Sequence, residues 1–516
     1  MLYAYEHDVR EQRSVEIRIE RDSDIPLYMQ IAEQIRVAVL RGDIADGQRL
    51  PPERRLAEQL GINRTTVVNA YRELAASGIV EGHVGRGTII TSVRGEDSQS
   101  PAVRPMAWGQ HFVRQPQWAH ATLVQEAADL AAQPGIISLA GGIPAPQLYP
   151  LDAFRQGCDD FLRKGSLDLL ANCPTEGFLP LRQWLADWVG SHGIDASAHH
   201  ILITSGSTQG IDLIARLLVE QDDEVVIENP TSLGIRQCFS SLRARTIGIP
   251  LDSDGMRVDV LRDVLNHHRP KLIYTLPTFQ NPTGVSLSTA RRAELIGIAR
   301  ERGIPIVEDD PYSDLSYGTP PPAPLKALDE GGHVIYIGTF SKVLFPGLRL
   351  GWVVAAEPVV QQLARLKRNV DLFSSTLAQG SLCYFLREFD WQEHLRRLCT
   401  TYRQRRDGMI AALRRHCPPG LHWETPAGGF YFWVQLPENV PTRELLAEAQ
   451  RSGVAFLPGE PFCDDNEGQH AIRLNFSYVE LPDIERGIRR LGEAISNVLE
   501  RRQGESVPPP ATRAIV

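Results

Sequence analysis

The chain of 516 residues contains no apolar run near the 18 residues that a membrane-spanning helix requires. Its first eight residues lack the basic start and the apolar stretch of a signal peptide. Its seven cysteines are scattered and form no Cys-x-x-Cys pair, which argues against a zinc motif or a disulfide framework. We therefore expect a cytoplasmic protein with reduced thiols, no metal site and no membrane partner.

The composition is that of an ordinary soluble protein, with 42% hydrophobic and 23% charged residues. The net charge of −9 excludes a uniformly basic protein that coats nucleic acid. The length predicts two to four domains, and we find no internal repeat.

Residues 24–91 have the pattern of a small helical domain with a two-stranded wing. Helices are predicted over 26–41, 51–61 and 63–77, with Pro26 at the first start and glycines at the stops. Asn63 is a plausible N-cap of the third helix. Residues 79–91 alternate as two short strands around a glycine-rich turn that contains Gly85.

The second and third helices have the spacing of a helix-turn-helix, whose second helix enters the DNA major groove with its N-terminal residues at the bases. The residues at that position are Asn63, Arg64, Thr65 and Thr66. Arg64 has the fork that can read guanine, and the threonines can bind phosphates or bases. Arg54 is predicted to contact the backbone, and Arg86 on the wing can enter the minor groove.

The local charge supports this interpretation, because residues 49–94 contain seven arginines and four acidic residues, a net of +3 inside an acidic chain. The alternative is a solvated helical hairpin whose arginines only pair with nearby glutamates. The segment resembles the winged helix-turn-helix of the GntR family, and the resemblance covers the helices, the turn and the wing tip. It implies binding to double-stranded DNA.

Beyond this head, composition divides the rest of the chain. Residues 1–23 are predicted to form an N-terminal arm, 92–117 a linker and 501–516 a disordered tail. Within 118–500, short apolar strands alternate with helical stretches, which predicts an α/β domain with a mainly parallel sheet. A smaller α+β subdomain is expected over about 395–500.

Five segments of this body place polar side chains at strand ends or in turns. They are the strand and turn at 201–209 with Ser207 and Thr208, the turn at 279–284 with Asn281, the strand end at 308–312 with Asp309 and Tyr312, the turn at 338–352 with Ser341, Lys342 and Arg349, and the strand at 472–476 with Arg473. Free backbone N–H groups at the start of a helix suit a phosphate. Each segment alone is an ordinary sequence, but together, in this order, they resemble the fold-type I aminotransferases of the aminoadipate type.

With a GntR-like head, this combination is similar to that of the MocR-type regulators. The resemblance implies pyridoxal 5′-phosphate (PLP) as cofactor, bound as a Schiff base to Lys342. It implies that Ser207, Thr208, Ser341 and Arg349 hold the phosphate, that Asp309 pairs with the pyridine nitrogen, and that Asn281 and Tyr312 bind the ring oxygen. Arg473 is expected to grip a substrate carboxylate, with Gly142 lining the same pocket.

Two positions depart from the family pattern. Ser232 stands where the family has an aromatic residue that stacks on the cofactor, and Asn172 stands where it has a tyrosine that reaches a phosphate, usually in the partner subunit. Losing the stack and the hydrogen bond costs about 1 kcal/mol each. These losses argue against rapid turnover, although the covalent imine remains possible.

The sequence therefore predicts a homodimeric transcription regulator that senses PLP or an amino acid through an aldimine at Lys342. The first alternative is an aminotransferase that retains turnover and has an accessory DNA-binding head. The second is a DNA-binding protein whose body is only a dimerisation scaffold without cofactor.

Overall fold

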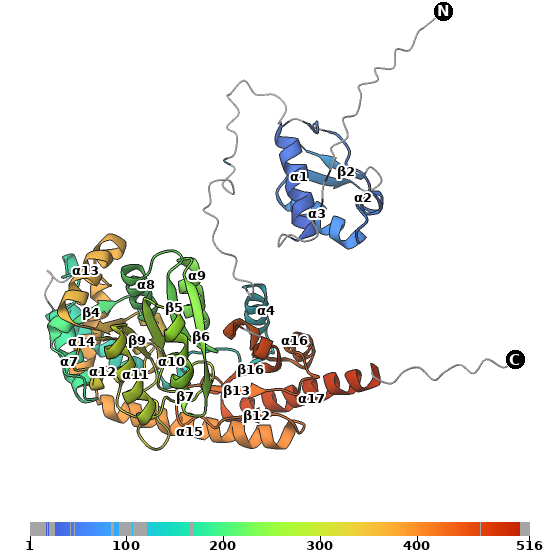
Figure 1. The fold of residues 1–516 in the computed structure, drawn as a ribbon. Coiled ribbons are helices and arrows are strands. Elements are labelled where there is room, and N and C mark those ends of the chain that lie inside the picture. Colours follow the sequence, from blue (N-terminus) through green and yellow to red (C-terminus); the bar gives the residue numbers. More distant parts are fainter. Residues whose placement is uncertain are drawn as a thin grey trace, which may run out of the picture. The chain divides into compact units, whose positions relative to one another are not determined.

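The computed structural model describes residues 17, 19, 26–41, 43–45, 47–83, 87–91, 106, 121–165, 170–464 and 466–505. The chain divides into two compact units, Met1–Phe112 and Val113–Val516, which we describe separately (Figure 1). Among the described residues, no helix combines the length and the apolar character needed to cross a membrane.

The first unit is a three-helix head with a two-stranded wing. Its elements are α1 (Leu27–Arg41), α2 (Glu53–Leu60), α3 (Arg64–Ala76), β1 (Val80–His83) and β2 (Gly87–Ile90). Apolar side chains at helical spacing, Ile31, Val67 and Leu74 among them, are fully buried between the helices. The strands β1 and β2 pair antiparallel. The predicted winged helix-turn-helix is therefore confirmed.

The second unit is built on an eight-stranded sheet in the order β4-β11-β10-β9-β8-β5-β6-β7. Its strands are β4 (Ile201–Thr204), β5 (Glu224–Asn229), β6 (Arg245–Asp252), β7 (Gly255–Met256), β8 (Leu272–Thr275), β9 (Ile306–Asp310), β10 (Val334–Thr339) and β11 (Gly351–Val354). The neighbours from β10 to β6 pair in parallel, whereas β11 runs antiparallel to both β10 and β4, and β7 antiparallel to β6. The mainly parallel sheet is as predicted.

Helices cover both faces of this sheet. They are α5 (Leu151–Lys164), α7 (Leu179–Gly190), α8 (Ser207–Leu218), α9 (Leu233–Ser241), α10 (Val258–His267), α11 (Thr289–Arg302), α12 (Leu325–Leu328), α13 (Glu357–Asp371) and α14 (Thr376–Glu388). Successive residues of β5 point to opposite faces, so Val225 and Ile227 join one hydrophobic cluster and Val226 joins another. The three central residues of β5, Val225 to Ile227, are apolar and completely buried, as expected for a strand covered on both faces.

The C-terminal part forms a smaller α+β subdomain. It contains α15 (Trp391–His416), β12 (His422–Trp423), β13 (Tyr431–Gln435), α16 (Thr442–Ser452), β14 (Val454–Ala455), β15 (Leu457–Pro458), β16 (Ala471–Asn475) and α17 (Leu481–Glu505). Short 3-10 helices occur throughout the second unit. They are η2 (Pro146–Leu148), η3 (Ala198–His200), η4 (Phe340–Lys342), η5 (Pro346–Leu348), and, within the small subdomain, η6 (Glu460–Phe462) and η7 (Asn466–His470). Four of the strands form a sheet in the order β12-β13-β16-β15.

The borders of this subdomain differ from the sequence-based ones in two places. Helix α4 (Ala121–Ala131) contacts β14 and β15, and β3 (Ile137–Ser138) pairs in parallel with β14, so an early segment of the body packs with its last part. Helix α17 continues past residue 500 to Glu505, into the region predicted as a tail, and there Arg501 and Arg502 form ion pairs with Glu448 and Glu444 of α16.

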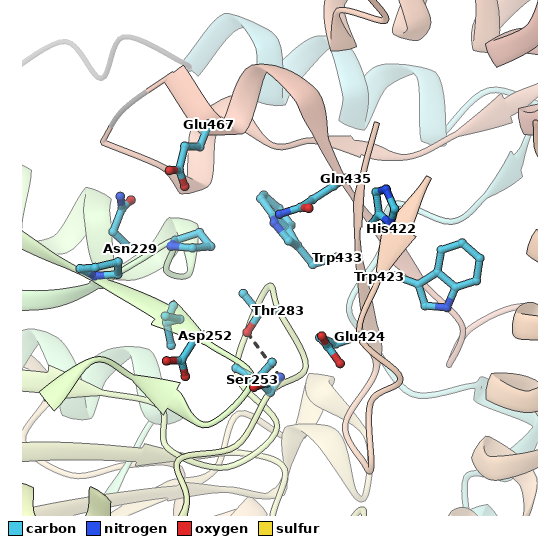
Figure 2. Close-up of a pocket in the computed structure, with 14 residues that line it drawn as sticks. Asn229, Asp252, Ser253, Thr283, His422, Trp423, Glu424, Trp433, Gln435 and Glu467 are labelled. Carbon is cyan, nitrogen blue, oxygen red and sulfur yellow. Dashed lines mark hydrogen bonds between the residues drawn. The ribbon is translucent and has the colours of Figure 1, made fainter. Parts of the chain in front are cut away.

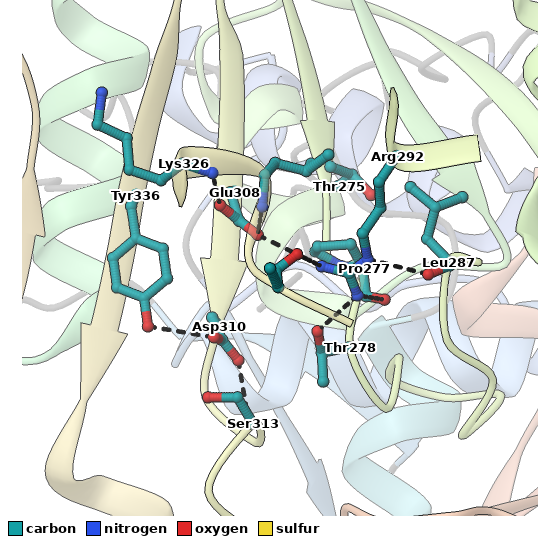
Figure 3. A network of polar contacts seen from close by, with 12 residues as sticks. Thr275, Pro277, Thr278, Leu287, Arg292, Glu308, Asp310, Ser313, Lys326 and Tyr336 are labelled. Atoms are coloured by element: carbon teal, nitrogen blue, oxygen red, sulfur yellow. Dashed lines mark hydrogen bonds and ion pairs between the residues drawn. The ribbon is translucent and has the colours of Figure 1, made fainter. Parts of the chain in front are cut away.

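A buried arginine connects the loops that surround the carboxyl ends of the central strands (Figure 3). Arg292 on α11 is completely buried and donates to the carbonyl oxygens of Leu287 and Pro277 at 2.9 and 2.8 Å. Its guanidinium lies 3.8 Å from the carboxylate of Glu308, which is also buried. Burial raises the pKa of Glu308 to about 7, while Arg292 acts in the opposite direction. The arginine therefore fixes the 277–287 segment against β9.

We expect Arg292→Leu to lower the free energy of unfolding by about 3–5 kcal/mol, because it leaves a buried carboxyl group without its counter-charge. The matched control is Arg300→Leu on the same helix, which removes an exposed ion pair with Glu330 and should cost about 0–1 kcal/mol. Chemical denaturation monitored by tryptophan fluorescence measures both. Equal changes in the two variants would contradict the role assigned to Arg292.

Candidate functional site

A cavity of about 830 Å³ lies at the carboxyl ends of the parallel strands, where open α/β sheets bind their ligands. Most of the residues that the sequence predicted for the cofactor line it. These are Ser207, Thr208, Asn281, Asp309, Lys342 and Arg349, together with Arg473. Segments separated by up to 266 positions, from 207 to 473, therefore meet at one place.

Lys342 ends the short helix η4, directly after the buried strand β10. Its ammonium group donates a hydrogen bond of 2.7 Å to the carbonyl oxygen of Gly142 and lies 5.8 Å from the centre of the Tyr312 ring. The structure thus brings the predicted nucleophile, Gly142 and Tyr312 together. Ser341 is tied to the same turn, because its hydroxyl accepts a hydrogen bond of 3.0 Å from Thr339.

Asp309 is buried at the end of β9 and is only partly satisfied. Its Oδ2 atom accepts a hydrogen bond of 2.7 Å from the hydroxyl of Tyr274, whereas Oδ1 is buried and has no hydrogen-bond partner within the described part of the chain. Burial raises the pKa of Asp309 to about 6, although Tyr274 and Lys342 act in the opposite direction. An unpaired buried oxygen is costly, so this atom is suited to a cationic N–H donor from a ligand.

The part of the cavity that the start of α8 lines is suited to an anion. Ser207 begins α8, so the positive end of the helix dipole faces the turn at 205–209. The guanidinium of Arg349 donates to the carbonyl oxygen of Ser205 at 3.4 Å. A side chain at Gly206 would place its Cβ 2.5 Å from this guanidinium, and Gly206 also has φ +89°, so the turn requires glycine there.

Arg473 on β16 reaches the cavity from the small subdomain. It donates hydrogen bonds to Asn281 Oδ1 at 2.9 Å and to the Ala140 carbonyl oxygen at 2.8 Å. Its guanidinium carbon lies 4.2 Å from the centre of the Tyr431 ring, within cation–π distance. Asn281 is thus oriented by Arg473, an interaction that the sequence did not predict.

Tyr431 is a site residue that the sequence analysis missed. Its hydroxyl accepts a hydrogen bond of 3.1 Å from Tyr312 and contacts the position that a side chain at Gly142 would occupy. Burial raises the pKa of Tyr431, but Arg473 and Lys342 outweigh it and hold the pKa below its usual value. Glycine at 142 is therefore necessary for Tyr431 to approach.

The two departures from the family pattern lie in different environments. Ser232 lines the cavity at the N-cap position of α9, so the aromatic residue expected there is replaced by a small polar one. Asn172 is exposed.

A second cavity of about 380 Å³ lies between loops of the large sheet and the strands β12 and β13 (Figure 2). Trp433 faces it from the small subdomain, and Asn229 and Asp252 face it from the large one. None of the residues predicted for the cofactor lines this cavity, so the cofactor expectation concerns the larger one alone.

In the head, the predicted DNA-contacting side chains lie at the start of α3. Asn63 caps this helix by accepting a hydrogen bond of 2.9 Å from the Thr65 backbone. Arg64 is exposed and forms an ion pair of 3.0 Å with Glu53. Thr65 is exposed and Thr66 is partly buried.

Arg54 is also exposed and pairs with Glu58 at 3.2 Å. Pairing of arginines with glutamates, as the alternative interpretation of the head expected, therefore does occur. Such exposed pairs are worth about 0–1 kcal/mol, so a phosphate or a guanine can displace them. Gly85 and Arg86 of the predicted wing tip lie outside the described residues.

Comparison with known proteins identifies a family for the DNA-binding head and a family for the body. Residues 154–491 match the family of aminotransferases of class I and II, whose members depend on PLP, and residues 27–90 match the gntR family of bacterial regulatory proteins. The chain is 37% identical to the multiple substrate aminotransferase from Thermococcus profundus, whose crystal structure superposes with a TM-score of 0.73 over 77% of this chain and 100% of that one.

Relatives with both domains cover nearly the whole chain. The uncharacterized HTH-type transcriptional regulator YisV of Bacillus subtilis is 34% identical over 93% of this chain and 98% of its own length. The probable rhizopine catabolism regulatory protein MocR of Rhizobium meliloti is 28% identical over 92% of this chain and 95% of its own. The chain therefore belongs to the aminotransferase class I and II family, and to its MocR-type regulators, in which a GntR-family DNA-binding domain precedes the aminotransferase-like body.

Proposed function

We propose that the body of this DNA-binding regulator binds PLP at Lys342 and senses either PLP itself or an amino acid held by Arg473. The observation that carries the proposal is the Oδ1 atom of Asp309, which is buried without a partner among the described residues in the cavity that Lys342 lines. A protonated pyridine nitrogen is the kind of donor that satisfies such an atom. The donor set of this cavity therefore fits the cofactor on which the family depends.

Different residues of the cavity bind different parts of PLP. When bound, PLP supplies an aldehyde for an amine and a ring that withdraws electrons. The Lys342 amine provides the covalent attachment, and Asp309 holds the charge of the ring nitrogen. Ser207, Thr208, Ser341 and Arg349 hold the phosphate. Asn281 and Tyr312 bind the ring oxygen.

The amino acid is bound on the side of the small subdomain. Arg473 is prepared for this role, because Asn281 and the Tyr431 ring hold its guanidinium, and its Nε atom is buried without a partner in the described chain. A carboxylate accepts two parallel hydrogen bonds from a guanidinium. Gly142 lies beside Lys342 and leaves room for the ligand.

The DNA-binding head reads double-stranded DNA through the N-terminal residues of α3. Arg64 contacts a base, with Asn63, Thr65 and Thr66 beside it at the start of α3, and Arg54 on α2 contacts the backbone. The protein acts as a homodimer, since two helix-turn-helix heads then read two half-sites on one DNA duplex.

A second candidate function is transamination with turnover. The similarity to the aminotransferase of Thermococcus profundus favours it, as does the presence of Lys342, Asp309 and Arg473 in one cavity. Ser232 and the exposed Asn172 argue against it. We infer that the sensor function is the better supported, because a sensor needs only to bind its ligand and to favour one of two states.

The purified protein should be yellow with PLP, and borohydride should bleach the absorbance band and attach the cofactor to Lys342. Lys342→Ala should lose the band, because Lys342 is the lysine that lines the cavity with Asp309 and Arg349. Lys271→Ala, which changes an exposed lysine paired with Asp223, is the matched control and should keep it. A wild-type protein that stays colourless with added PLP excludes the cofactor and supports a body that is only a scaffold.

Arg64→Ala should weaken operator binding by about 1–3 kcal/mol and relax specificity at one base pair. Arg54→Ala should weaken binding to all sequences alike and reduce its salt dependence. Binding titrations at several salt concentrations measure both effects, with Arg155→Ala on the exposed surface of the body as control. Unchanged operator affinity for Arg64→Ala would mean that α3 does not read the bases in this way.

Ser232→Tyr should tighten PLP about fivefold, the equivalent of about 1 kcal/mol, by restoring a ring beside the cofactor. Ser241→Tyr at the exposed end of the same helix is the control. The wild type should show little turnover in a coupled assay with 2-oxoglutarate. Steady-state turnover of the wild type near 1 s⁻¹, roughly the low end for enzymes, would instead favour the aminotransferase.

A further inference from the structure

An ion pair with a completely buried lysine contacts the turn at the start of α8. Lys367 and Asp371 are one turn apart at the end of α13, and the Lys367 side chain is completely buried. Its ammonium group donates to both carboxylate oxygens of Asp371, at 2.6 and 2.7 Å. Burying an ammonium group costs free energy that its ion pair does not always recover. We therefore ask what else the pair does besides stabilising the end of α13.

Both partners also contact the turn between β4 and α8. Asp371 accepts hydrogen bonds from the Gln209 side-chain amide at 2.8 Å and from the Ser205 hydroxyl at 3.2 Å. The side-chain oxygen of Gln209, Oε1, accepts hydrogen bonds from the Lys367 ammonium group at 3.2 Å and from the Ser205 backbone N–H at 2.8 Å. Ser205 and Gln209 are thus each connected to the ion pair and to each other.

The residues held in this way enclose Ser207 and Thr208, the start of α8 that faces the cavity. The same turn has Gly206 at φ +89°, and Arg349 packs against it from the other side. The conformation of the turn therefore depends on two sets of contacts. Arg349, which lines the cavity, makes one set, and the Lys367–Asp371 pair, which does not line it, makes the other. The charges of Lys367 and Asp371 cancel, so the pair acts on the turn by geometry more than by its field.

We propose that Lys367 and Asp371 are positioning residues for a phosphate monoester: they hold the Ser205–Gln209 turn so that Ser207 and Thr208 present their N–H and hydroxyl groups to the phosphate. The inference rests on the proposed function, since it takes PLP as the phosphate-bearing ligand. It assigns a role to two residues that touch neither the cofactor nor the amino acid, and that act through Gln209 and Ser205.

The test compares two aldehydes that differ only in the phosphate, namely PLP and pyridoxal. Dissociation constants come from absorbance titrations of the full-length protein. Gln209→Leu keeps the ion pair and removes the connection to the turn that runs through Gln209, while the hydrogen bond from Ser205 to Asp371 remains. The double variant Lys367→Gln/Asp371→Asn removes both charges together. Arg365→Gln, an exposed change on the same helix, is the control.

We expect both variants to bind PLP about tenfold more weakly, the loss typical of one charge-assisted hydrogen bond, and to bind pyridoxal as the wild type does. Inorganic phosphate should compete with PLP in the wild type and should need about tenfold higher concentration in the variants. The Arg365→Gln protein should match the wild type throughout.

Equal losses for PLP and pyridoxal would overturn the proposal, because they indicate a general effect on folding. Unchanged binding of both aldehydes in Gln209→Leu would overturn it as well. A wild-type protein that binds neither aldehyde would instead overturn the proposed function, and this inference with it. Pyridoxal binding that is intact while PLP binding is lost is the pattern that supports it.

Discussion

Three consecutive buried carboxyl groups at the end of β9 are the constraint on which the body depends. Glu308 is compensated by Arg292, and Asp310 accepts hydrogen bonds from the Tyr336 hydroxyl and the Ser313 backbone N–H. Asp309 has one oxygen satisfied by Tyr274 and one left without a partner in the described chain. Because side chains alternate along a strand, Glu308 and Asp310 point away from Asp309. The fold thus stabilises two of these groups internally and leaves one oxygen of the third unpaired in the cavity that Lys342 lines, where we propose that the ligand binds.

Much of the fold and of the site could be predicted from the sequence, because its motifs lie where strands end. The three helices of the head lie within two residues of their predicted bounds, and Lys342 and Asp309 line one cavity as the parallel sheet requires. No local pattern indicated Tyr274, Tyr431 or Lys367. Each acts through a partner distant in sequence, such as Asp309 for Tyr274 and Gln209 for Lys367. The packing of α4 and β3 with the small subdomain was missed for the same reason.

In the DNA-binding head, the sequence motif predicted the helices correctly but did not predict which acidic residues pair with the arginines. The sequence predicted the helices, the Asn63 cap and the exposed Arg64, but the choice between DNA contact and surface pairing depended on which acids lie near. In the structure Glu53, which is half-buried, pairs with the exposed Arg64, and the exposed Glu58 pairs with the exposed Arg54. Pairs of this kind are weak enough to exchange for contacts with nucleic acid.

The central claim is that ligand occupancy at Lys342 changes how the protein binds DNA. The most direct measurement is operator affinity of the full-length protein with and without PLP, and with PLP plus each amino acid of a panel, by fluorescence anisotropy at fixed salt. The account predicts an affinity that changes by about fivefold or more with at least one of these ligands, the range of ordinary allosteric coupling, and no change in Lys342→Ala. Operator affinity that is the same in every ligand state of the wild type would contradict it.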